Sequence, residues 1–164
     1  VNAYITVTEE QALESARLAD KVIAGGGADM LCGIPMSVKD NISTKGMLTT
    51  CASKILSNYT PVFDATAVQK LKDAGAVILG KTNLDEFGMG STCENSFYGP
   101  TKNPHDLTCV PGGSSGGLAV FVASGTSVYG IGSVTGCYIA EAAHVLGIVG
   151  LKHTSFSYTH INLP

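Results

Sequence analysis

The sequence predicts an α/β fold, in which helices alternate along the chain with short apolar strands. Two observations carry this prediction. Apolar residues recur at helical spacing in several segments, and continuous apolar runs bounded by glycines lie between those segments. Short runs of this kind are typical of strands that are buried on both faces, as in a parallel sheet. No linker divides the 164 residues into two domains.

Capping residues and glycines define the elements expected in the first half. Thr8 and Gln11 form a capping box, which predicts a helix that runs to Ile23 before three glycines. Asp64 is expected to cap a second helix that ends at Ala74. The apolar runs predict strands over 33–38 and 76–79.

The second half is apolar and rich in glycine. Residues 111–117, Pro-Gly-Gly-Ser-Ser-Gly-Gly, must form a loop because this composition does not sustain a helix or a strand. The elements expected after this loop are a helix over 118–124, a strand over 127–132, a helix over 139–146 and a strand over 147–151. Between Leu107 and Leu151 the only formal charge is Glu141. We therefore expect part of the layer that covers this segment to lie outside the chain.

Composition excludes several classes of protein. Apolar residues make up 45% of the chain, which excludes disorder. The net charge of −3 gives no electrostatic reason for nucleic-acid binding by this chain alone. No apolar run approaches the ~20 residues that a membrane span needs, and no signal peptide is visible. The five cysteines contain no C-x-x-C pair, which argues against a disulfide framework or a zinc site and favours a reducing compartment.

Two short patterns match motifs that bind phosphate or carry a nucleophile. Residues 75–82 fit G-x-x-x-x-G-K-[ST], but the intervening residues are apolar, and a buried strand cannot wrap a phosphate. Residues 113–117 contain G-x-S-x-G, with Ser115 as the candidate nucleophile. Pro111 interrupts the strand that should lead into such a turn, and no acidic residue lies between Ser115 and Glu141. A serine hydrolase that uses Ser115 remains an alternative.

Lys39 follows an apolar strand in an uncharged neighbourhood. A solvated lysine at a strand end is the plain interpretation. A lysine removed from water instead has a lowered pKa and can act as a base toward a serine hydroxyl. The glycine-rich loop could bring Ser114 to this lysine, which is the Ser–Lys form of nucleophilic catalysis.

Four separated motifs occur in a fixed order along the chain. They are Leu-Cys-Gly-Ile-Pro-Met-Ser-Val-Lys-Asp-Asn (31–41), Gly-Lys-Thr-Asn-Leu-Asp-Glu-Phe-Gly-Met-Gly-Ser (80–91), Gly-Pro-Thr-Lys-Asn-Pro (99–104) and the loop 111–117. Together they resemble the amidase signature family over about residues 30–153. The residues at 49–53 and 85–87 are most similar to those of the family branch that contains the A subunits of glutamyl-tRNA(Gln) amidotransferases. The resemblance implies that residues 1–164 are the N-terminal portion of an amidase-signature domain, with a mixed β-sheet covered by helices and the C-terminal part absent.

The same resemblance implies amide hydrolysis by a Ser–cis-Ser–Lys triad. It places the lysine at Lys39 and the bridging serine at Ser114. It also assigns an oxyanion hole to Thr135, Gly136 and Cys137, and a substrate loop to Gly112, Gly113 and Ser115. Tyr138 stands where the family has its nucleophilic serine. Because a phenol is bulky and has a pKa near 10, we expect this chain to be impaired or inactive.

Partners also follow from the resemblance. The substrate is expected to be glutamine or another small amide, and the B and C subunits of the amidotransferase are the expected protein partners. Contact with tRNA is expected only through a partner subunit, and no cofactor, metal or membrane is expected. The compartment is the cytoplasm for a bacterial protein, and otherwise a mitochondrial or plastid matrix. A catalytically dead amidase-like binding or scaffold module, or a gene fragment, is the remaining alternative.

Overall fold

The computed structural model of the chain describes residues 1–134 and 138–152, without the side chain of Tyr138. Its elements follow in the order β1 (Tyr4–Val7), α1 (Glu9–Ala24), β2 (Pro35–Lys39), α2 (Thr66–Asp73), β3 (Val77–Thr82), the 3-10 turn η1 (Glu86–Gly88), α3 (Gly116–Ala123), β4 (Tyr129–Ile131) and α4 (Tyr138–Leu146). Helices and strands alternate from β1 to α4. The α/β class expected from the sequence is therefore confirmed.

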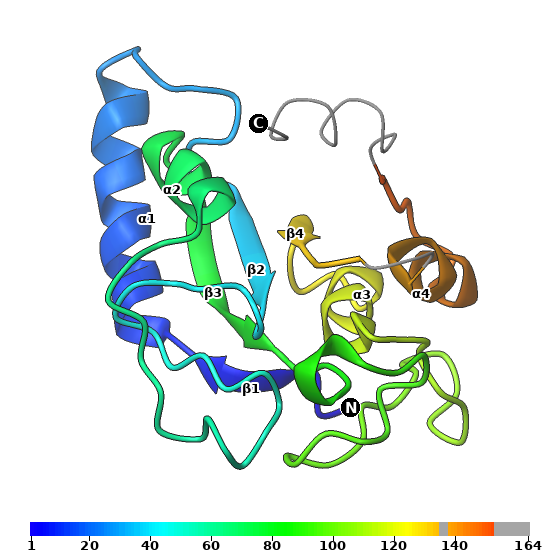
Figure 1. Cartoon of the computed structure of the whole chain (residues 1–164). Coiled ribbons are helices and arrows are strands. Elements are labelled where there is room, and N and C mark those ends of the chain that lie inside the picture. Colours follow the sequence, from blue (N-terminus) through cyan, green and yellow to red (C-terminus); the bar gives the residue numbers. More distant parts are fainter. Residues whose placement is uncertain (135–137, 153–164) are drawn as a thin grey trace, which may run out of the picture.

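The four strands form one mixed sheet in the order β1-β3-β2-β4. Strand β2 runs parallel to both β3 and β4, whereas β1 runs antiparallel to β3 at one edge. Helices α1 and α2 lie on one side of this sheet, and α3 and α4 lie on the other (Figure 1). The expectation of a mixed sheet covered by helices is confirmed.

Alternation along β2 divides its side chains between the two faces. Met36 and Val38 are fully buried in one core with Val68 of α2 and Ile78 of β3. Successive side chains of a strand point to opposite faces, so the neighbouring residues face the other helix layer. A second, smaller core on that side is formed by Ala3, Ala119, Val120, Ala142 and Leu146.

Polar side chains of β2 face the layer that contains α3. The Ser37 hydroxyl lies 2.6 Å from the hydroxyl of Tyr4, whose ring packs edge-on against Phe121 of α3. Lys39 lies two residues further along the same face, at the end of β2. The strand therefore directs this lysine toward the loop that precedes α3.

Helix α3 approaches the sheet closely at Gly117. A Cβ built at this position would lie 2.4 Å from the carbonyl oxygen of Asn83 and 2.6 Å from that of Ala3. Both contacts are with backbone, which cannot move aside as a flexible side chain can. This close approach sets the N-terminal end of α3 beside the end of β3, and with it the loop that contains Ser114.

We expect Gly117→Ala to lower the free energy of unfolding by about 1–3 kcal/mol, because the methyl group overpacks a well-filled contact. The matched control is Gly27→Ala, since a Cβ at Gly27 would meet no atom within 4 Å. The control should change stability by no more than about 0.5 kcal/mol. Urea unfolding followed by circular dichroism measures both. Equal effects of the two substitutions would contradict the close approach of α3.

Two expected elements differ from those in the structure. Strand β1 was not predicted, because Tyr4–Val7 is short and its pairing with β3 joins segments far apart in the sequence. The strand predicted over 147–151 is wrong, since these residues form no strand after α4. Gly147 has a φ of +68°, and the N–H of Ile148 instead bonds the carbonyl of Ala143 at the end of that helix. Apolar character alone cannot make a strand where no neighbouring strand supplies hydrogen bonds.

The two predicted helix caps also differ in detail. Thr8 occupies the N-cap of α1, but its side chain makes no capping hydrogen bond and donates to the carbonyl of Ile78 at 3.4 Å. Asp64 does not cap α2, whose N-cap is Ala65. The Asp64 carboxylate instead accepts hydrogen bonds from Lys72 at 2.8 Å and from the backbone N–H of Lys45. In both cases the side chain expected to cap the helix bonds a different group and leaves the first backbone N–H groups of the helix uncapped.

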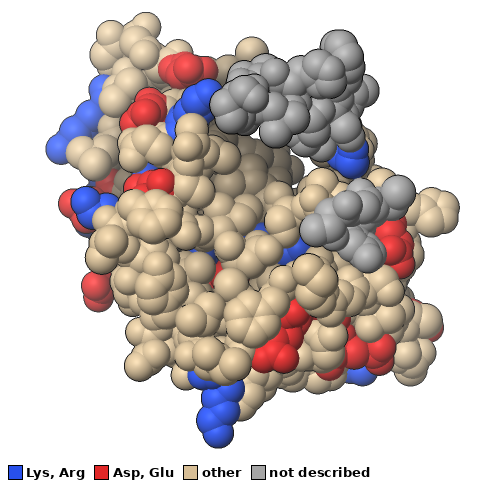
Figure 2. Space-filling view, viewed as in Figure 1, with Lys and Arg blue, Asp and Glu red and all other residues tan. Residues whose placement is uncertain are grey.

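Charged side chains are unevenly distributed on the face shown in Figure 2. In the face shown in Figure 2 most of them lie around the margin, and the middle is largely uncharged. No helix in the described part of the chain has the length and apolar character that crossing a membrane requires.

Candidate active site

Lys39 and Ser114 meet between the end of β2 and the start of α3. The Nζ of Lys39 donates a hydrogen bond of 2.7 Å to the Oγ of Ser114, 75 residues away in sequence. The same Nζ lies 3.4 Å from the carbonyl oxygen of Ser133, which follows β4. The peptide bond between Gly113 and Ser114 is cis. The structure thus brings together the two residues that the sequence analysis singled out as lysine and bridging serine.

Both members of this pair are excluded from solvent. Lys39 is 0% exposed and Ser114 is 2% exposed. Burial lowers the pKa of Lys39 from 10.5 to about 8, while the nearby Cys93 and Asp85 act in the opposite direction. A lysine with this pKa is partly neutral near physiological pH, so it can accept a proton from the hydroxyl that it contacts.

Polar groups from three segments converge around Gly88, beside the pair. Asn41 donates a hydrogen bond of 2.8 Å from its Nδ2 to the Oγ of Ser133. A Cβ placed on Gly88 would lie 3.3 Å from that Nδ2, 3.8 Å from the Oγ of Ser114 and 4.0 Å from the Oγ of Ser133. Because Gly88 has no side chain, two hydroxyls and an amide can approach the backbone closely at this point.

A second buried lysine lies close to the site but has different partners. Lys81 is 0% exposed, and its Nζ lies 3.4 Å from Oδ1 of Asp40, the residue that follows Lys39. Burial raises the pKa of Asp40 and lowers that of Lys81, and the attraction between the two opposes both shifts. Thr50 donates to the other carboxylate oxygen from its backbone N–H at 2.8 Å and from its hydroxyl. This ion pair fixes the backbone that immediately follows Lys39.

The lysine of the rejected phosphate-loop pattern is this same Lys81. It lies in β3, which occupies Val77–Thr82, so residues 75–82 do not form a phosphate loop. Its Nζ donates to the carbonyl of Ile42 at 2.9 Å and to the hydroxyl of Thr49 at 2.6 Å. The interpretation of this segment as a strand is confirmed, although Gly80 lies within the strand and does not end it.

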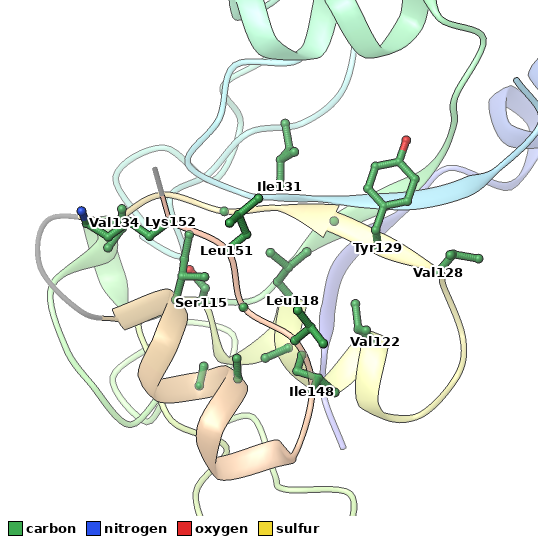
Figure 3. Close-up of a pocket in the computed structure, with 18 residues that line it drawn as sticks. Ser115, Leu118, Val122, Val128, Tyr129, Ile131, Val134, Ile148, Leu151 and Lys152 are labelled. Atoms are coloured by element: carbon green, nitrogen blue, oxygen red, sulfur yellow. The ribbon is translucent and has the colours of Figure 1, made fainter. Parts of the chain in front are cut away.

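An apolar pocket of about 650 Å³ opens beside the pair, between α3, β4 and α4 (Figure 3). Its wall includes Leu118 and Val122 of α3, Ile131 of β4 and Leu151 after α4. Ser115 lies at the edge of this pocket, and its hydroxyl donates to the carbonyl of Ser133 at 3.4 Å. No histidine or carboxylate of the described segments is a hydrogen-bond partner of the Ser115 hydroxyl.

The remaining predicted site residues lie in two places. Gly112 and Gly113 belong to the loop before α3, and a Cβ on Gly112 would come within 2.9 Å of Ala142 in α4. Thr135, Gly136 and Cys137, the expected oxyanion hole, lie outside the described residues. Tyr138 is the first residue of α4, but its side chain also lies outside the described part.

Metal ligands do not gather at the site. Within residues 1–134 and 138–152 no group of three or more His, Cys, Asp or Glu side chains could hold a metal ion. The cysteines of these ranges, Cys32, Cys51, Cys93 and Cys109, are free thiols.

The sequence of the chain matches the amidase family over residues 1–160. The chain belongs to this family. The A subunit of glutamyl-tRNA(Gln) amidotransferase from Carboxydothermus hydrogenoformans is 57% identical to it over 155 residues, and that from Desulfatibacillum aliphaticivorans is 55% identical over 154. Each match covers 94% of this chain and 32% of the relative. This amidase-family chain thus spans about a third of the length of the curated relatives it matches.

Solved amidase structures share its fold. The A subunit of glutamyl-tRNA(Gln) amidotransferase from Thermotoga maritima is 45% identical, with a TM-score of 0.70 over 83% of this chain and 34% of its own length. The peptide amidase of Stenotrophomonas maltophilia is 38% identical, with a TM-score of 0.81 over 87% of this chain and 30% of its own. The predicted family and its fold are therefore confirmed.

Sequence reasoning about this amidase-family chain missed several residues around the pair. Asn41 and Asp85 occur within the family motifs and Ser133 lies outside them, but nothing in the local sequence of the three shows what they contact. Their partners lie 92 residues away for Asn41 and 29 residues away for Asp85. Only the folding of β2, β4 and the loop before α3 into one place reveals these contacts. The available signal for Asn41 was its position as a polar residue two residues after a buried strand.

Proposed function

We propose that this chain provides the base and the proton relay of an amide-hydrolysing site, in the lineage of the A subunit of glutamyl-tRNA(Gln) amidotransferase. The single observation that carries the proposal is the 2.7 Å contact between Lys39 and Ser114 in a site closed to water. The substrate class is a small carboxamide, with glutamine as the first candidate. Family membership supports amide hydrolysis as the chemistry.

The proposed reaction proceeds by two coupled proton transfers. Neutral Lys39 accepts the proton of the Ser114 hydroxyl, and Ser114 in turn takes a proton from the nucleophilic hydroxyl. That oxygen forms a bond to the carbonyl carbon of the amide, and backbone N–H groups of 135–137 would stabilise the negative oxygen. The C–N bond then breaks, and the nitrogen leaves as ammonia with a proton returned through Ser114. Water hydrolyses the resulting ester by the same relay.

This chain departs from the proposed mechanism at the residue that should act as the nucleophile. The family position for the attacking serine is Tyr138 in this sequence. A phenol attacks poorly at neutral pH and is too large for a site shaped around a serine. We therefore propose that the unmodified chain releases little or no ammonia, although its base and relay remain in place.

Partners and compartment follow from the same lineage. The B and C subunits of the amidotransferase are the proposed protein partners, with tRNA held by a partner subunit and no cofactor held by this chain. Residues 1–164 are proposed to be part of a larger amidase-signature domain. Cytoplasm is the proposed compartment for a bacterial protein such as the relatives named above, and an organelle matrix otherwise.

Restoring the serine tests the proposal. A fluorophosphonate probe labels a serine only when a base has activated its hydroxyl. We expect no labelling of the unmodified chain and labelling of residue 138 in Tyr138→Ser, located by peptide mass spectrometry. Adding Lys39→Met or Ser114→Ala to Tyr138→Ser should slow the labelling by about a hundredfold, because the proton acceptor is lost. Ammonia release from glutamine is measured on the same proteins.

Two outcomes would overturn the proposal. Labelling of Tyr138→Ser that persists after Lys39→Met would mean that Lys39 is not the base. Labelling of the unmodified chain at Ser115 would instead support the serine hydrolase alternative. The matched control is Ser124→Ala, which removes a hydroxyl just after the C-terminal end of α3, where that hydroxyl contacts the carbonyl of Phe121 and the hydroxyl of Thr126. This control should leave the labelling unchanged.

A binding module without catalysis is the second candidate, and the tyrosine at position 138 favours it. Such a module would bind glutamine without consuming it. Calorimetric titration with glutamine, combined with an ammonia assay, separates the two candidates. Saturable heat of binding from the unmodified chain, with no ammonia release even from Tyr138→Ser, would identify the binding module.

A further inference from the structure

Asp85 has a buried carboxyl group that the proposed mechanism does not use. The residue lies between β3 and η1 and is 1% exposed. Its Oδ2 accepts a hydrogen bond of 3.0 Å from the backbone N–H of Cys93, whereas Oδ1 is buried with no hydrogen-bond partner in the described part of the chain. A buried acceptor without a hydrogen-bond partner destabilises the folded chain. One oxygen of the carboxyl group thus holds the backbone of Cys93, while the other has no structural hydrogen bond in the described part of the chain.

The same residue is attached directly to the loop that contains Ser114. The backbone N–H of Asp85 donates to the carbonyl oxygen of Ser114 at 3.3 Å. A Cβ on Gly113 would lie 2.2 Å from Oδ2 of Asp85, and a Cβ on Gly90 would lie 2.4 Å from its Cγ. The carboxyl group thus lies between the backbones of two glycines on separate loops. Any side chain at either glycine would displace it.

Asp85 also lies within electrostatic reach of Lys39. The titratable groups of the described residues that act on Lys39 are Cys93 and Asp85, and both favour the charged amine against the larger, opposing effect of burial. Asp40 is adjacent to Lys39 in sequence, but its carboxylate pairs with Lys81. Among the described residues, Asp85 is therefore the carboxyl group that interacts electrostatically with Lys39.

We propose that Asp85 is a positioning residue for the Lys39–Ser114 pair: it holds the Ser114 peptide in place and supplies the negative charge that stabilises Lys39 once it is protonated. The inference rests on the proposed function, since it gives Asp85 a part in the proton transfer. In that transfer the O–H bond of Ser114 breaks and an N–H bond forms on Lys39. The resulting ammonium ion is out of water, so a fixed carboxylate nearby lowers its energy.

The substitution Asp85→Asn tests this inference because it keeps the shape and the acceptor for Cys93 but removes the charge. The readout is the titration midpoint of Lys39, followed by the ¹⁵Nζ resonance of the isotope-labelled lysine in the full chain. We expect the midpoint to move from about 8 downward by about one unit in Asp85→Asn. The matched control is Glu86→Gln, which removes the same charge one residue away and should leave the midpoint unchanged. If Asp85 only held the loop together, the titration midpoint of Lys39 would be the same in Asp85→Asn, in Glu86→Gln and in the unmodified chain.

A measurement on the unmodified chain keeps the inference testable if Asp85→Asn does not fold. The ¹³Cγ resonance of Asp85 should shift with the same midpoint as the ¹⁵Nζ resonance of Lys39, and Lys39→Met should abolish that shift. Independent titration of the two resonances, or an unchanged Lys39 midpoint in folded Asp85→Asn, would overturn the inference. Neither measurement uses a substrate. A failure of amide hydrolysis would therefore count against the proposed function and leave the role of Asp85 standing.

Discussion

Replacing Lys81 with methionine lowers the free energy of unfolding by about 3–5 kcal/mol, because it leaves the carboxylate of Asp40 buried without its positive partner. Methionine has nearly the same volume as lysine, so the loss is electrostatic and not the result of a cavity. Both residues are 0% exposed, which excludes relief by water. Urea unfolding of the two proteins at pH 7 measures the difference.

The double variant Asp40→Asn with Lys81→Met is the control for this prediction. It removes both charges and keeps an oxygen that can accept the hydrogen bond from the N–H of Thr50. We expect it to recover more than half of the loss, because replacing both partners of a buried pair is close to neutral. If the double variant is no more stable than Lys81→Met alone, the ion pair is not what the substitution disrupts.

The loss caused by Lys81→Met should also depend on pH. Burial raises the pKa of Asp40, and Lys81 is the first of the interactions that oppose this shift, so the pKa rises further when Lys81 is absent. A carboxyl group whose folded pKa is raised stabilises the protein fully below its unfolded pKa and loses that contribution as pH rises through its folded pKa. The difference between Lys81→Met and the unmodified chain should therefore shrink as the pH is lowered from 7 toward 4.

The stability difference between the unmodified chain and Lys39→Met should rise by up to about 3 kcal/mol in favour of the lysine between pH 7 and pH 10.5. The pKa of Lys39 is lowered by burial from 10.5 to about 8 in the folded chain, and a displacement of that size corresponds to about 3 kcal/mol. A group whose folded pKa is depressed stabilises the protein fully above its unfolded pKa. That stabilisation is lost as the pH falls through the folded pKa, here about 8.

Urea unfolding at a series of pH values, with both proteins at each pH, gives this difference directly. Lys70 lies exposed on α2, and Lys70→Met is the control because its amine stays in water in the folded chain. The control should give a difference that does not change with pH. A flat profile for Lys39→Met as well would mean that Lys39 is solvated, and the proposed role of Lys39 as a base would lose its physical basis.

Local sequence signals located most of the elements on which the site is built. The apolar run over 33–38 corresponds to β2, the run over 76–79 to β3, and the segment expected as a helix over 118–124 to α3. These signals are local, since each depends on the periodicity of a few consecutive residues and on the glycines beside them. Strand β1 could not be found in this way, because its pairing with β3 depends on residues far apart in the chain.

The pairing of Lys39 with Ser114 was expected from motifs, but its surroundings were not. Two lysines follow apolar runs in this sequence, and local composition does not distinguish them. Each lysine contacts a hydroxyl, Ser114 for Lys39 and Thr49 for Lys81. Lys81 is also paired with the carboxylate of Asp40, which favours its charged form, so Lys39 is the better candidate for a base toward serine. The two lysines differ in their partners because their side chains contact different loops in the folded chain.

Short motifs and local periodicity were enough to predict the family and the α/β class, and they pointed to Lys39 and Ser114 as candidate site residues. The environment of that pair could be seen only in the folded chain: the burial that lowers the pKa of Lys39, the hydrogen bond from Asn41 to Ser133, and the contact of Asp85 with the backbone of Ser114. Burial and charge act through space, over segments separated by many residues. They exist only once β2, β3, β4 and α3 have packed together.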